Sequence, residues 1–438
     1  MADYLSSSRD SRQEMLKELG LADIYDLYKD VPADLILRDG LELPHGVSEQ
    51  EVLRIMKKLA KQNKVYDSIF RGAGSYHHYI PAIVDQVAAK ETFLTAYTPY
   101  QAEISQGILQ NIFEYQTMIC KLTGMDVSNA SVYDGATAAA EAAAMCRDRK
   151  KNRILVSAAA DPEVRRVIET YSWAAGGEVV MVPEKDRHTD LEALKEMLDG
   201  TAAAVYFQQP DFYGTIEDMD AIVEMAHAVK AKVIAGVNPI AAAILKTPGE
   251  AGCDICVGEG QPLGLPLGYG GPYLGFMAAK KDMMRKLPGR IVGQTADDQG
   301  RTAYVLTLQA REQHIRREKA SSNICSNEAL CALRAAVYLS AMGREGVKDA
   351  ARQCLAKAHY LQQELAKIGY VRDGEGEFFH EFVTETPIPA AEVNHLLDEH
   401  GILGGLALDE NHILRCATEM NTKESMDEVI HILKGACA

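Results

Sequence analysis

Short apolar runs alternate with helix-like segments between residues 153 and 279. The runs are short and apolar, which predicts strands. In chain order they read RILVS, EVVMVP, AAAVYFQ, KVIAGV, CDICVG and YLGFMAA. The segments between them, such as the one from about Glu217 to Lys230, have the spacing of helices of roughly ten to thirteen residues. This alternation predicts βαβ units, a mostly parallel sheet and an α/β fold class.

Capping residues predict where several helices begin, because a Ser, Thr or Asp side chain accepts hydrogen bonds from the free N–H groups of the first turn. The predicted caps are Ser11 with Glu14, Ser48 with Glu51, Asp161 with Pro162, and Thr189 with Glu192. A long helix is also predicted from Glu103 to a stop at Gly124. Its core-facing stripe would consist of Ile104, Ile108, Leu109, Ile112, Phe113 and Ile119.

The pattern changes twice along the chain and predicts three regions. Residues 1–65 contain helical segments with Pro- and Gly-rich connectors and no strand, which indicates an arm that lies on something else. Residues 66–320 contain the α/β alternation and form the predicted large domain. Residues 321–438 begin with two long helices and continue with short strands and helices, which predicts a smaller α+β domain.

Composition and charge exclude several classes of protein. The 438 residues include 46 basic and 62 acidic side chains, a net charge of −16, which argues against a nucleic-acid binder. The polar start MADYLSSSRDSRQEML is typical of neither a signal peptide nor a membrane anchor, so we expect a cytoplasmic protein. The nine cysteines are expected to be reduced thiols. Cys253 and Cys256 have metal-like spacing, but no second ligand pair accompanies them, so they are expected in a buried strand and no metal site is predicted.

Several motifs have both a functional and a structural interpretation. Neither GAGSYH nor GEGQPLG completes a dinucleotide-binding fingerprint, which argues against a nicotinamide site. The segment DGATAAAEAAAM offers either a phosphate-binding helix start or an ordinary capped helix. The loops of residues 71–81 and 96–107, and the glycine-rich segment 258–276, are candidate site segments. The basic run REQHIRREK is either a solvated helix face or a contact with an anion or a subunit.

Taken together, these segments resemble the glycine cleavage system P-protein family, and within it the first, or alpha, subunit of the split bacterial form. The resemblance covers essentially the whole chain. It rests on FRGAGSYHHYIPAIV, YTPYQAEISQGILQNIFEYQTMI, NASVYDGATAAAEA, GQPLGLPLGYGGPYLGF, LPGRIVGQT and LQAREQHIRREKASSNIC. It implies the fold type I architecture of pyridoxal-phosphate enzymes, with a large seven-stranded domain and a small C-terminal domain. It also implies decarboxylation of glycine and transfer of the aminomethyl group to the lipoyl arm of H-protein.

The chain departs from the family's catalytic pattern at one position. Alignment with the beta-type segment places Gln261 where the Schiff-base lysine is expected, and an amide cannot form an imine. Asn238 stands near the position where the family's fold usually has an acidic residue that pairs with the pyridine nitrogen of the cofactor. Pyridoxal phosphate is therefore expected to be bound covalently by the beta subunit. Any contact from this chain would be vestigial or shared, through Gly135, Ala136, Thr137 and Asn238.

The resemblance also implies that this chain completes the active site of its partner. The supporting candidates are Tyr97, Tyr100, Gln101 and Glu103, with His77 and His78 behind them. The expected partners are the beta subunit, in an α₂β₂ assembly, lipoylated H-protein and glycine, with no nucleic acid or membrane. Two alternatives stay open: a stand-alone pyridoxal-phosphate enzyme that uses Lys246, Lys280 or Lys281, and a scaffold that only stabilises the beta subunit.

Overall fold

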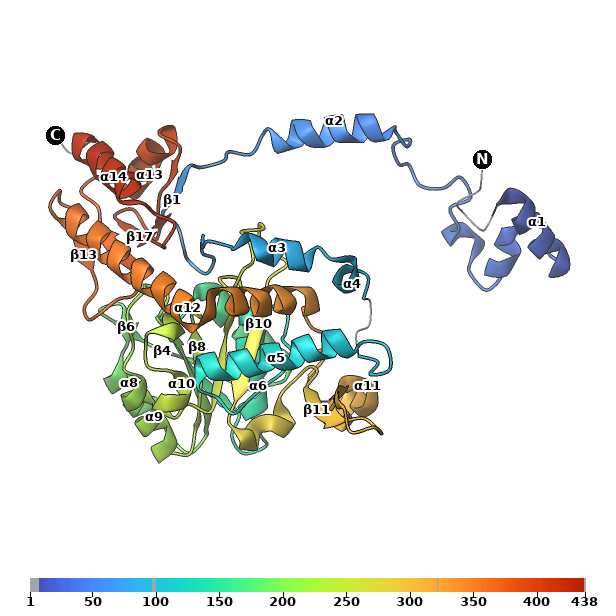
Figure 1. Ribbon diagram of the computed structural model, residues 1–438, viewed down its shortest axis with the longest axis horizontal. Helices are drawn as coiled ribbons and strands as arrows, with labels where there is room; N and C mark the ends of the chain where they lie inside the picture. Colours follow the sequence, from blue (N-terminus) through green and yellow to red (C-terminus); the bar gives the residue numbers. More distant parts are fainter. Residues whose placement is uncertain (1–7, 97–99, 321, 437–438) are drawn as a thin grey trace. The chain divides into compact units, whose positions relative to one another are not determined.

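The computed structural model describes residues 8–96, 100–320 and 322–436, and the chain divides into two units, Met1–Val65 and Tyr66–Ala438 (Figure 1). The helices of the first unit are α1 (Arg9–Glu18), η1 (Ile24–Tyr28), η2 (Ala33–Leu35) and α2 (Glu49–Ala60). Ser48 caps α2 as predicted, because its side chain accepts the Glu51 N–H at 3.3 Å. The prediction for α1 is wrong by one turn. Ser8 is its cap and accepts the Ser11 N–H, which places Ser11 inside the first turn.

A seven-stranded sheet forms the centre of the second unit. Its spatial order is β2 (Val127–Ser128), β10 (Gly275–Ala279), β9 (Ile255–Glu259), β8 (Lys232–Val237), β7 (Ala202–Gln209), β3 (Arg153–Ser157) and β4 (Glu178–Val182). The last five are parallel, whereas β10 is antiparallel to both of its neighbours. The predicted α/β class and mostly parallel sheet are confirmed.

Helices cover both faces of this sheet, which explains why its strands are continuously apolar (Figure 1). One face packs against α6 (Gly135–Cys146) and α7 (Pro162–Ala174). The other packs against α5 (Gln106–Thr123), α8 (Leu191–Met197), α9 (Met219–Ala228) and the first part of α12 (Ala329–Ala366). Neighbouring strand residues serve opposite faces: Leu155 packs on the second group of helices, and Ile154 on the first.

Three details of this unit differ from the sequence-based expectation. Helix α5 begins at Gln106 rather than at Glu103, and Ile104 is 77% exposed because it precedes the helix. Asp190 rather than Thr189 caps α8, since its carboxylate accepts two N–H groups of the first turn. The Thr189 hydroxyl instead bonds to Ser157 and Glu217. Asp161 caps α7 and Gly124 ends α5 in the left-handed conformation, as predicted.

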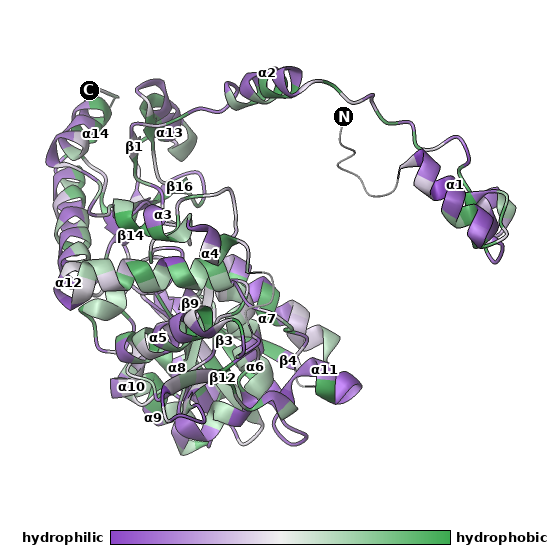
Figure 2. Ribbon diagram, turned by 45° about the vertical axis from the view of Figure 1, so that its right-hand side comes forward, coloured by the Kyte–Doolittle hydropathy of each residue, from purple (hydrophilic) through white to green (hydrophobic). Residues whose placement is uncertain are grey.

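An antiparallel sheet follows towards the C-terminus. It comprises β13 (Arg372–Asp373), β14 (Glu381–Glu385), β17 (His412–Cys416) and β16 (Leu406–Ala407) in spatial order. It packs on α13 (Ala390–Glu399), α14 (Lys423–Ala436) and the second part of α12, which is kinked at Gly343 (φ 61°). Alternating bands on α12 and α14 in Figure 2 reflect one polar and one apolar face. A domain boundary between residues 320 and 321 stays a prediction.

Short elements complete the second unit. They are β1 (Ser68–Ile69), α3 (Ala82–Ala88), α4 (Glu91–Leu94), β5 (Glu184–Lys185), β6 (His188–Thr189), η3 (Ala241–Ala243), α10 (Pro248–Ala251), η4 (Lys281–Lys286), β11 (Val292–Ala296), β12 (Thr302–Leu306), η5 (Gln309–Arg311), α11 (Gln313–Arg316), η6 (Arg317–Lys319) and β15 (Ile402–Leu403). Cys253 and Cys256 are fully buried as expected, with free thiols. Among the described helices, none combines the length and the apolar character that crossing a bilayer requires.

Two glutamines of α5 hold the β11–β12 hairpin. The Gln116 side chain donates to Val292 O at 2.9 Å and accepts from Val292 N at 3.0 Å. Gln106 makes the same pair of bonds with Tyr304 on the other strand. Each amide replaces a missing strand partner, so the hairpin is positioned by side chains of a helix rather than by a third strand.

We expect Gln116→Ala to lower the free energy of unfolding by about 1–3 kcal/mol, because it leaves a buried N–H and a buried carbonyl without partners. Gln110→Ala is the matched control, since Gln110 is exposed and bonds to exposed Glu114, and it should change stability by less than about 0.5 kcal/mol. Urea unfolding followed by circular dichroism measures both. Equal effects of the two variants would contradict the proposed clamp.

Candidate functional site

A cavity of about 520 Å³ opens at the carboxyl ends of the parallel strands. Ligand sites of open α/β sheets form at this edge. Its lining comes from the ends of β7, β8 and β9, the starts of α6 and α7, and two loops. The residues are Gly74, Tyr76, Asp134, Gly135, Ala136, Asp161, Glu163, Val164, Tyr206, Gln208, Gly236, Val237, Asn238, Pro239, Gly258, Glu259, Gly270 and Tyr273.

Gln261 lies directly behind this lining and is almost fully buried, with 1% of its surface exposed. Its Oε1 accepts the Tyr76 N–H at 2.9 Å, and its Nε2 donates to Tyr76 O at 2.9 Å and Leu265 O at 2.8 Å. The amide therefore joins the loop of residue 76 to the segment after β9. Every principal hydrogen-bonding group of this side chain is engaged with backbone.

Carboxylates occupy the start of α6. Asp134 caps the helix, because its Oδ1 accepts the Thr137 N–H at 2.7 Å. Glu259 Oε2 accepts the Gly135 N–H at 3.0 Å, and its Oε1 accepts from Gln261 N and Leu274 N. Burial raises the pKa of Glu259 to about 7, although these backbone N–H groups oppose the shift. The contact is close: a Cβ at position 135 would lie 2.7 Å from Glu259 N.

The Asn238 side chain serves the local backbone. Its Oδ1 accepts from Ile240 N at 2.9 Å and Ala241 N at 3.1 Å, where η3 begins. Its Nδ2 lies 3.4 Å from His380 Nε2. Burial lowers the pKa of His380 to about 3, so this imidazole is neutral at physiological pH.

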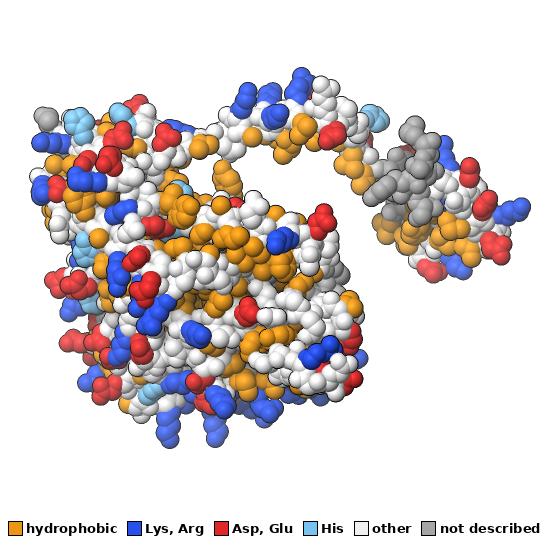
Figure 3. Space-filling model, in the orientation of Figure 1, with side chains coloured by type: hydrophobic (Ala, Val, Ile, Leu, Met, Phe, Trp, Pro, Cys, Tyr) orange, Lys and Arg blue, Asp and Glu red, His pale blue; other side chains and the backbone are white. Residues whose placement is uncertain are grey.

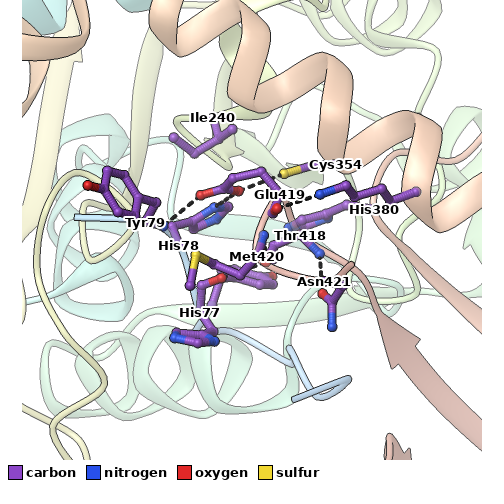
Figure 4. Close-up of polar contacts among 12 residues, drawn as sticks. His77, His78, Tyr79, Ile240, Cys354, His380, Thr418, Glu419, Met420 and Asn421 are labelled. Atoms are coloured by element: carbon purple, nitrogen blue, oxygen red, sulfur yellow. Dashed lines mark hydrogen bonds and ion pairs between the residues drawn. The ribbon is translucent and has the colours of Figure 1, made fainter. Parts of the chain in front are cut away.

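A second polar cluster surrounds Glu419 (Figure 4). His78 Nδ1 lies 2.7 Å from Glu419 Oε2, the Tyr79 N–H donates to Oε1, and the Cys354 thiol donates to Oε2 at 3.2 Å. Burial favours a higher pKa for Glu419, but the His78 contact and these donors outweigh it and lower the pKa to about 2. The atoms of His78, Cys354 and Glu419 that could ligate a metal lie within 4.8 Å of one another. The hydrogen bonds of His78 and Cys354 to Glu419 account for that proximity.

The comparisons with known proteins identify the family. A model of the glycine cleavage system P-protein family matches residues 2–433. The chain is 50% identical over 443 residues to the probable glycine dehydrogenase (decarboxylating) subunit 1 of Moorella thermoacetica, covering 99% of this chain and 100% of that protein. The chain belongs to the glycine cleavage system P-protein family. The resemblance predicted from sequence is confirmed.

Other comparisons agree with this membership. A protein of the same name from Desulfitobacterium hafniense is 46% identical, with 98% of each chain covered. The crystal structure of a glycine decarboxylase (P-protein) in inhibitor-bound form superposes with a TM-score of 0.92 at 40% identity and 99% coverage of both chains. A sphingosine-1-phosphate lyase from Burkholderia pseudomallei shares only the fold, with a TM-score of 0.67, 15% identity and coverage of 91% and 92%. The fold type I architecture is therefore confirmed.

The residues of this P-protein chain do not fit pyridoxal phosphate. None of the described side chains that line the cavity is a lysine or an arginine, whereas Asp134, Asp161, Glu163 and Glu259 are acidic. Glu259 already holds the Gly135 N–H that a phosphate would need at the helix start. Asn238 is engaged with backbone, and Gln261 cannot form an imine.

The other predicted site residues lie in different surroundings. Tyr97 falls outside the described residues. Tyr100 bonds to Asn327 Oδ1 at 2.6 Å, with the Arg290 guanidinium 4.8 Å from its ring centre. Gln101 and Glu103 are exposed, and the cavity lining includes none of these three.

The two predicted histidines differ from each other. His78 is 5% exposed and bonded to Glu419, whereas His77 is half-buried with a pKa lowered by burial. The Thr418 hydroxyl donates to His77 O at 2.6 Å. Figure 4 shows that the two rings point in different directions. The structure thus ties the His77–His78 segment to residues 418–419.

The basic run REQHIRREK is neither a continuous helix nor a simple solvated face. Arg311 donates to the carbonyls of Leu287 and, at 2.7 Å, of Gly289. Burial lowers the pKa of Arg311 to about 10. Glu312 pairs with Arg290, which in turn lies over Tyr100. Part of the run is therefore internal structure.

Sequence analysis missed several acidic residues of the site. Glu259 is the last residue of the buried strand β9 and lies within the segment GEGQPLG, so its position is a usable signal. Glu381 accepts the Ala73 N–H and the Tyr76 hydroxyl, both at 2.7 Å, and burial raises its pKa to about 7. Its signal is an acidic residue at the start of strand β14, directly before the apolar pair Phe382 and Val383. Glu419 carries no local signal.

We expect Glu419→Gln to lower the unfolding free energy by about 2–3 kcal/mol at pH 7, because it removes a charge from a largely buried pair. The folded-state pKa of Glu419 lies below its ordinary value of 4.5, so this contribution is complete above about pH 4.5 and is lost as pH falls towards 2. The difference in melting temperature between wild type and variant should shrink over that interval. Exposed Glu410→Gln is the control; a constant difference for Glu419→Gln would contradict the depressed pKa.

Proposed function

We propose that this chain is the alpha subunit of a glycine dehydrogenase (decarboxylating) of the glycine cleavage system and is inactive alone. With its beta subunit it would decarboxylate glycine and pass the aminomethyl group to lipoylated H-protein in the cytoplasm. The observation that carries this proposal is the burial and full hydrogen bonding of Gln261, which the family resemblance aligns with the Schiff-base lysine. Pyridoxal phosphate supplies the electron sink when bound, and we assign it to the beta subunit.

The lysines of this chain support the same assignment. Lys246 pairs with Asp220 at 2.6 Å on the surface. Lys280 and Lys281 follow the antiparallel strand β10, whose end pairs with the start of β9, so they lie at the sheet edge opposite the cavity. Lys280 Nζ donates to Gly252 O at 2.6 Å. None of them lines the cavity, which argues against a stand-alone enzyme.

Helix α2 offers a surface for the partner subunit. Within the first unit, its apolar residues Val52, Leu53, Ile55, Met56 and Leu59 are between 45% and 56% exposed, and no residue of the helix is buried. Figure 3 shows these hydrophobic side chains gathered along one side of α2, with Lys and Arg on the other. Such an amphipathic helix is stabilised by packing its apolar side on another surface. We propose that this surface belongs to the beta subunit, in an α₂β₂ assembly.

The proposed function is tested by reconstitution. The chain alone should release no carbon dioxide from glycine above background in the presence of pyridoxal phosphate and lipoylated H-protein. Addition of subunit 2 from the same genome should restore activity at a one-to-one ratio. Activity of the chain alone would overturn the proposal, and full activity of subunit 2 alone would reduce this chain to a scaffold.

We expect Leu53→Asp to weaken association with subunit 2 at least tenfold, because it places a charge on the apolar side of α2. Gln50→Asp puts the same charge on an exposed polar position of α2 and is the matched control. Size-exclusion chromatography with light scattering measures the assembly. Unchanged assembly of both variants would exclude α2 from the interface.

We propose that Gln101 and Glu103, and with them Tyr100, reach the partner's active site. Glu103→Ala should leave assembly intact and lower kcat/KM of the complex at least tenfold, about 1.4 kcal/mol of transition-state stabilisation. Glu114→Ala, which changes an exposed glutamate of α5, is the control. Full activity of Glu103→Ala and of Gln101→Ala would contradict donation by this segment.

A further inference from the structure

A second cavity, of about 600 Å³, lies on the face of the central sheet that α5 and α12 cover. Its walls come from the end of α5, the segment from η3 to α10, and α12 around its kink at Gly343 (Figure 1). It shares no lining residue with the cavity at the strand ends. The chemistry of this helix-side cavity is therefore independent of the cofactor site.

Close packing fixes one wall of the helix-side cavity, and the kink of α12 opens the other. A Cβ at Gly124, which ends α5, would lie 2.6 Å from Thr247 Oγ1, and a Cβ at Gly249 would overlap the Gly124 carbonyl. Gly343 has a φ of 61°, and a Cβ there would meet no atom within 4 Å. The cavity is thus built between a tightly packed wall and open space at the kink.

The floor of the helix-side cavity is aliphatic. Its larger apolar side chains are Met118, Leu122, Ile244, Leu245, Leu339 and Val347. All except the buried Val347 are partly exposed, so they present apolar surface to the cavity. No aromatic side chain belongs to the described lining. This floor can bury an alkyl chain, but it offers no ring on which a nucleobase could stack.

Positive charge gathers at the same cavity, although the chain as a whole carries a net charge of −16. Arg344 and Lys348 are four residues apart and share one face of α12, while Lys121 comes from the last turn of α5. None of the described carboxylates pairs with Lys121 or Arg344, and Lys348 Nζ lies 4.0 Å from Glu345. Lys121 and Arg344 are exposed, which places their charges at the rim, above the aliphatic floor.

Glu250 is the single acidic side chain of the described lining, and local donors already bind its carboxylate. Its Oε2 accepts the Thr247 N–H at 3.0 Å and the Thr247 hydroxyl at 2.9 Å. These two bonds lower the pKa of Glu250, so it is charged at neutral pH. Three basic side chains stand against this one carboxylate, which favours an anion over a cation.

We propose that the helix-side cavity binds an aliphatic carboxylate, a fatty acid of about six to ten carbon atoms. The carboxylate would pair with Arg344 and Lys348 at the rim, and the alkyl chain would lie on the aliphatic floor. A volume of about 600 Å³ accommodates such a molecule. This inference goes beyond the proposed function and does not rest on it, because no residue of the strand-end cavity takes part.

The test compares octanoate with two probes that each lack one of its features. Acetate keeps the carboxylate without the chain, and octylammonium keeps the chain with the opposite charge. Isothermal titration of the full-length chain should give a Kd for octanoate below about 1 mM and at least tenfold weaker binding of both other probes. Absence of saturable octanoate binding at about 10 mM, or equal affinity for octylammonium, would overturn the proposal.

Two variants locate the binding. Arg344→Gln removes a charge from the rim, and Leu122→Asp places a carboxylate on the floor; each should weaken octanoate binding at least fivefold. Lys195→Gln removes the same kind of charge from an exposed position of α8 outside the cavity and should leave Kd unchanged. Melting temperatures verify that each variant is folded. Unchanged Kd values for both Arg344→Gln and Leu122→Asp would contradict the assignment to this cavity.

Discussion

The side-chain amide of Gln261 holds together the two loops that shape the cavity. It accepts the Tyr76 N–H and donates to Tyr76 O and Leu265 O, and it is almost fully buried. Tyr76 in turn donates its hydroxyl to Glu381 of the C-terminal sheet. The Gln261 side chain therefore clamps the backbone of these two loops beside the cavity.

Glu259 also binds backbone groups beside the cavity. Its carboxylate receives three backbone N–H groups, including the Gly135 N–H at the start of α6, where the helix dipole favours negative charge. An internal carboxylate thus satisfies donors that would otherwise be available to a phosphate. The bonding of Gln261 and Glu259 gives two reasons why the cavity of this chain does not fit pyridoxal phosphate.

The architecture follows closely from sequence because it depends on local patterns. Short apolar runs that alternate with helical segments predict the mostly parallel sheet, and Asp161 followed by Pro162 predicts the cap of α7. Neighbouring capping candidates were harder to separate: Ser8 was missed for Ser11, and Asp190 for Thr189. In the second pair, the Thr189 hydroxyl is engaged by Ser157 and Glu217, which come together only in the folded chain.

The site depends on contacts between distant residues, and sequence patterns do not show them. His78 and Glu419 are separated by 341 positions, and Gly135 and Glu259 by 124. Gln261 was found through the family resemblance, but its three backbone bonds required the structure.

Borohydride reduction of the assembled two-subunit enzyme, followed by peptide mass mapping, tests the central claim most directly. Reduction converts a cofactor imine into a stable pyridoxyl-lysine that marks the subunit holding the cofactor. The account predicts this label on a lysine of the partner subunit and on no lysine of this chain. A pyridoxyl label on Lys246, Lys280, Lys281 or any other lysine of this chain would contradict it.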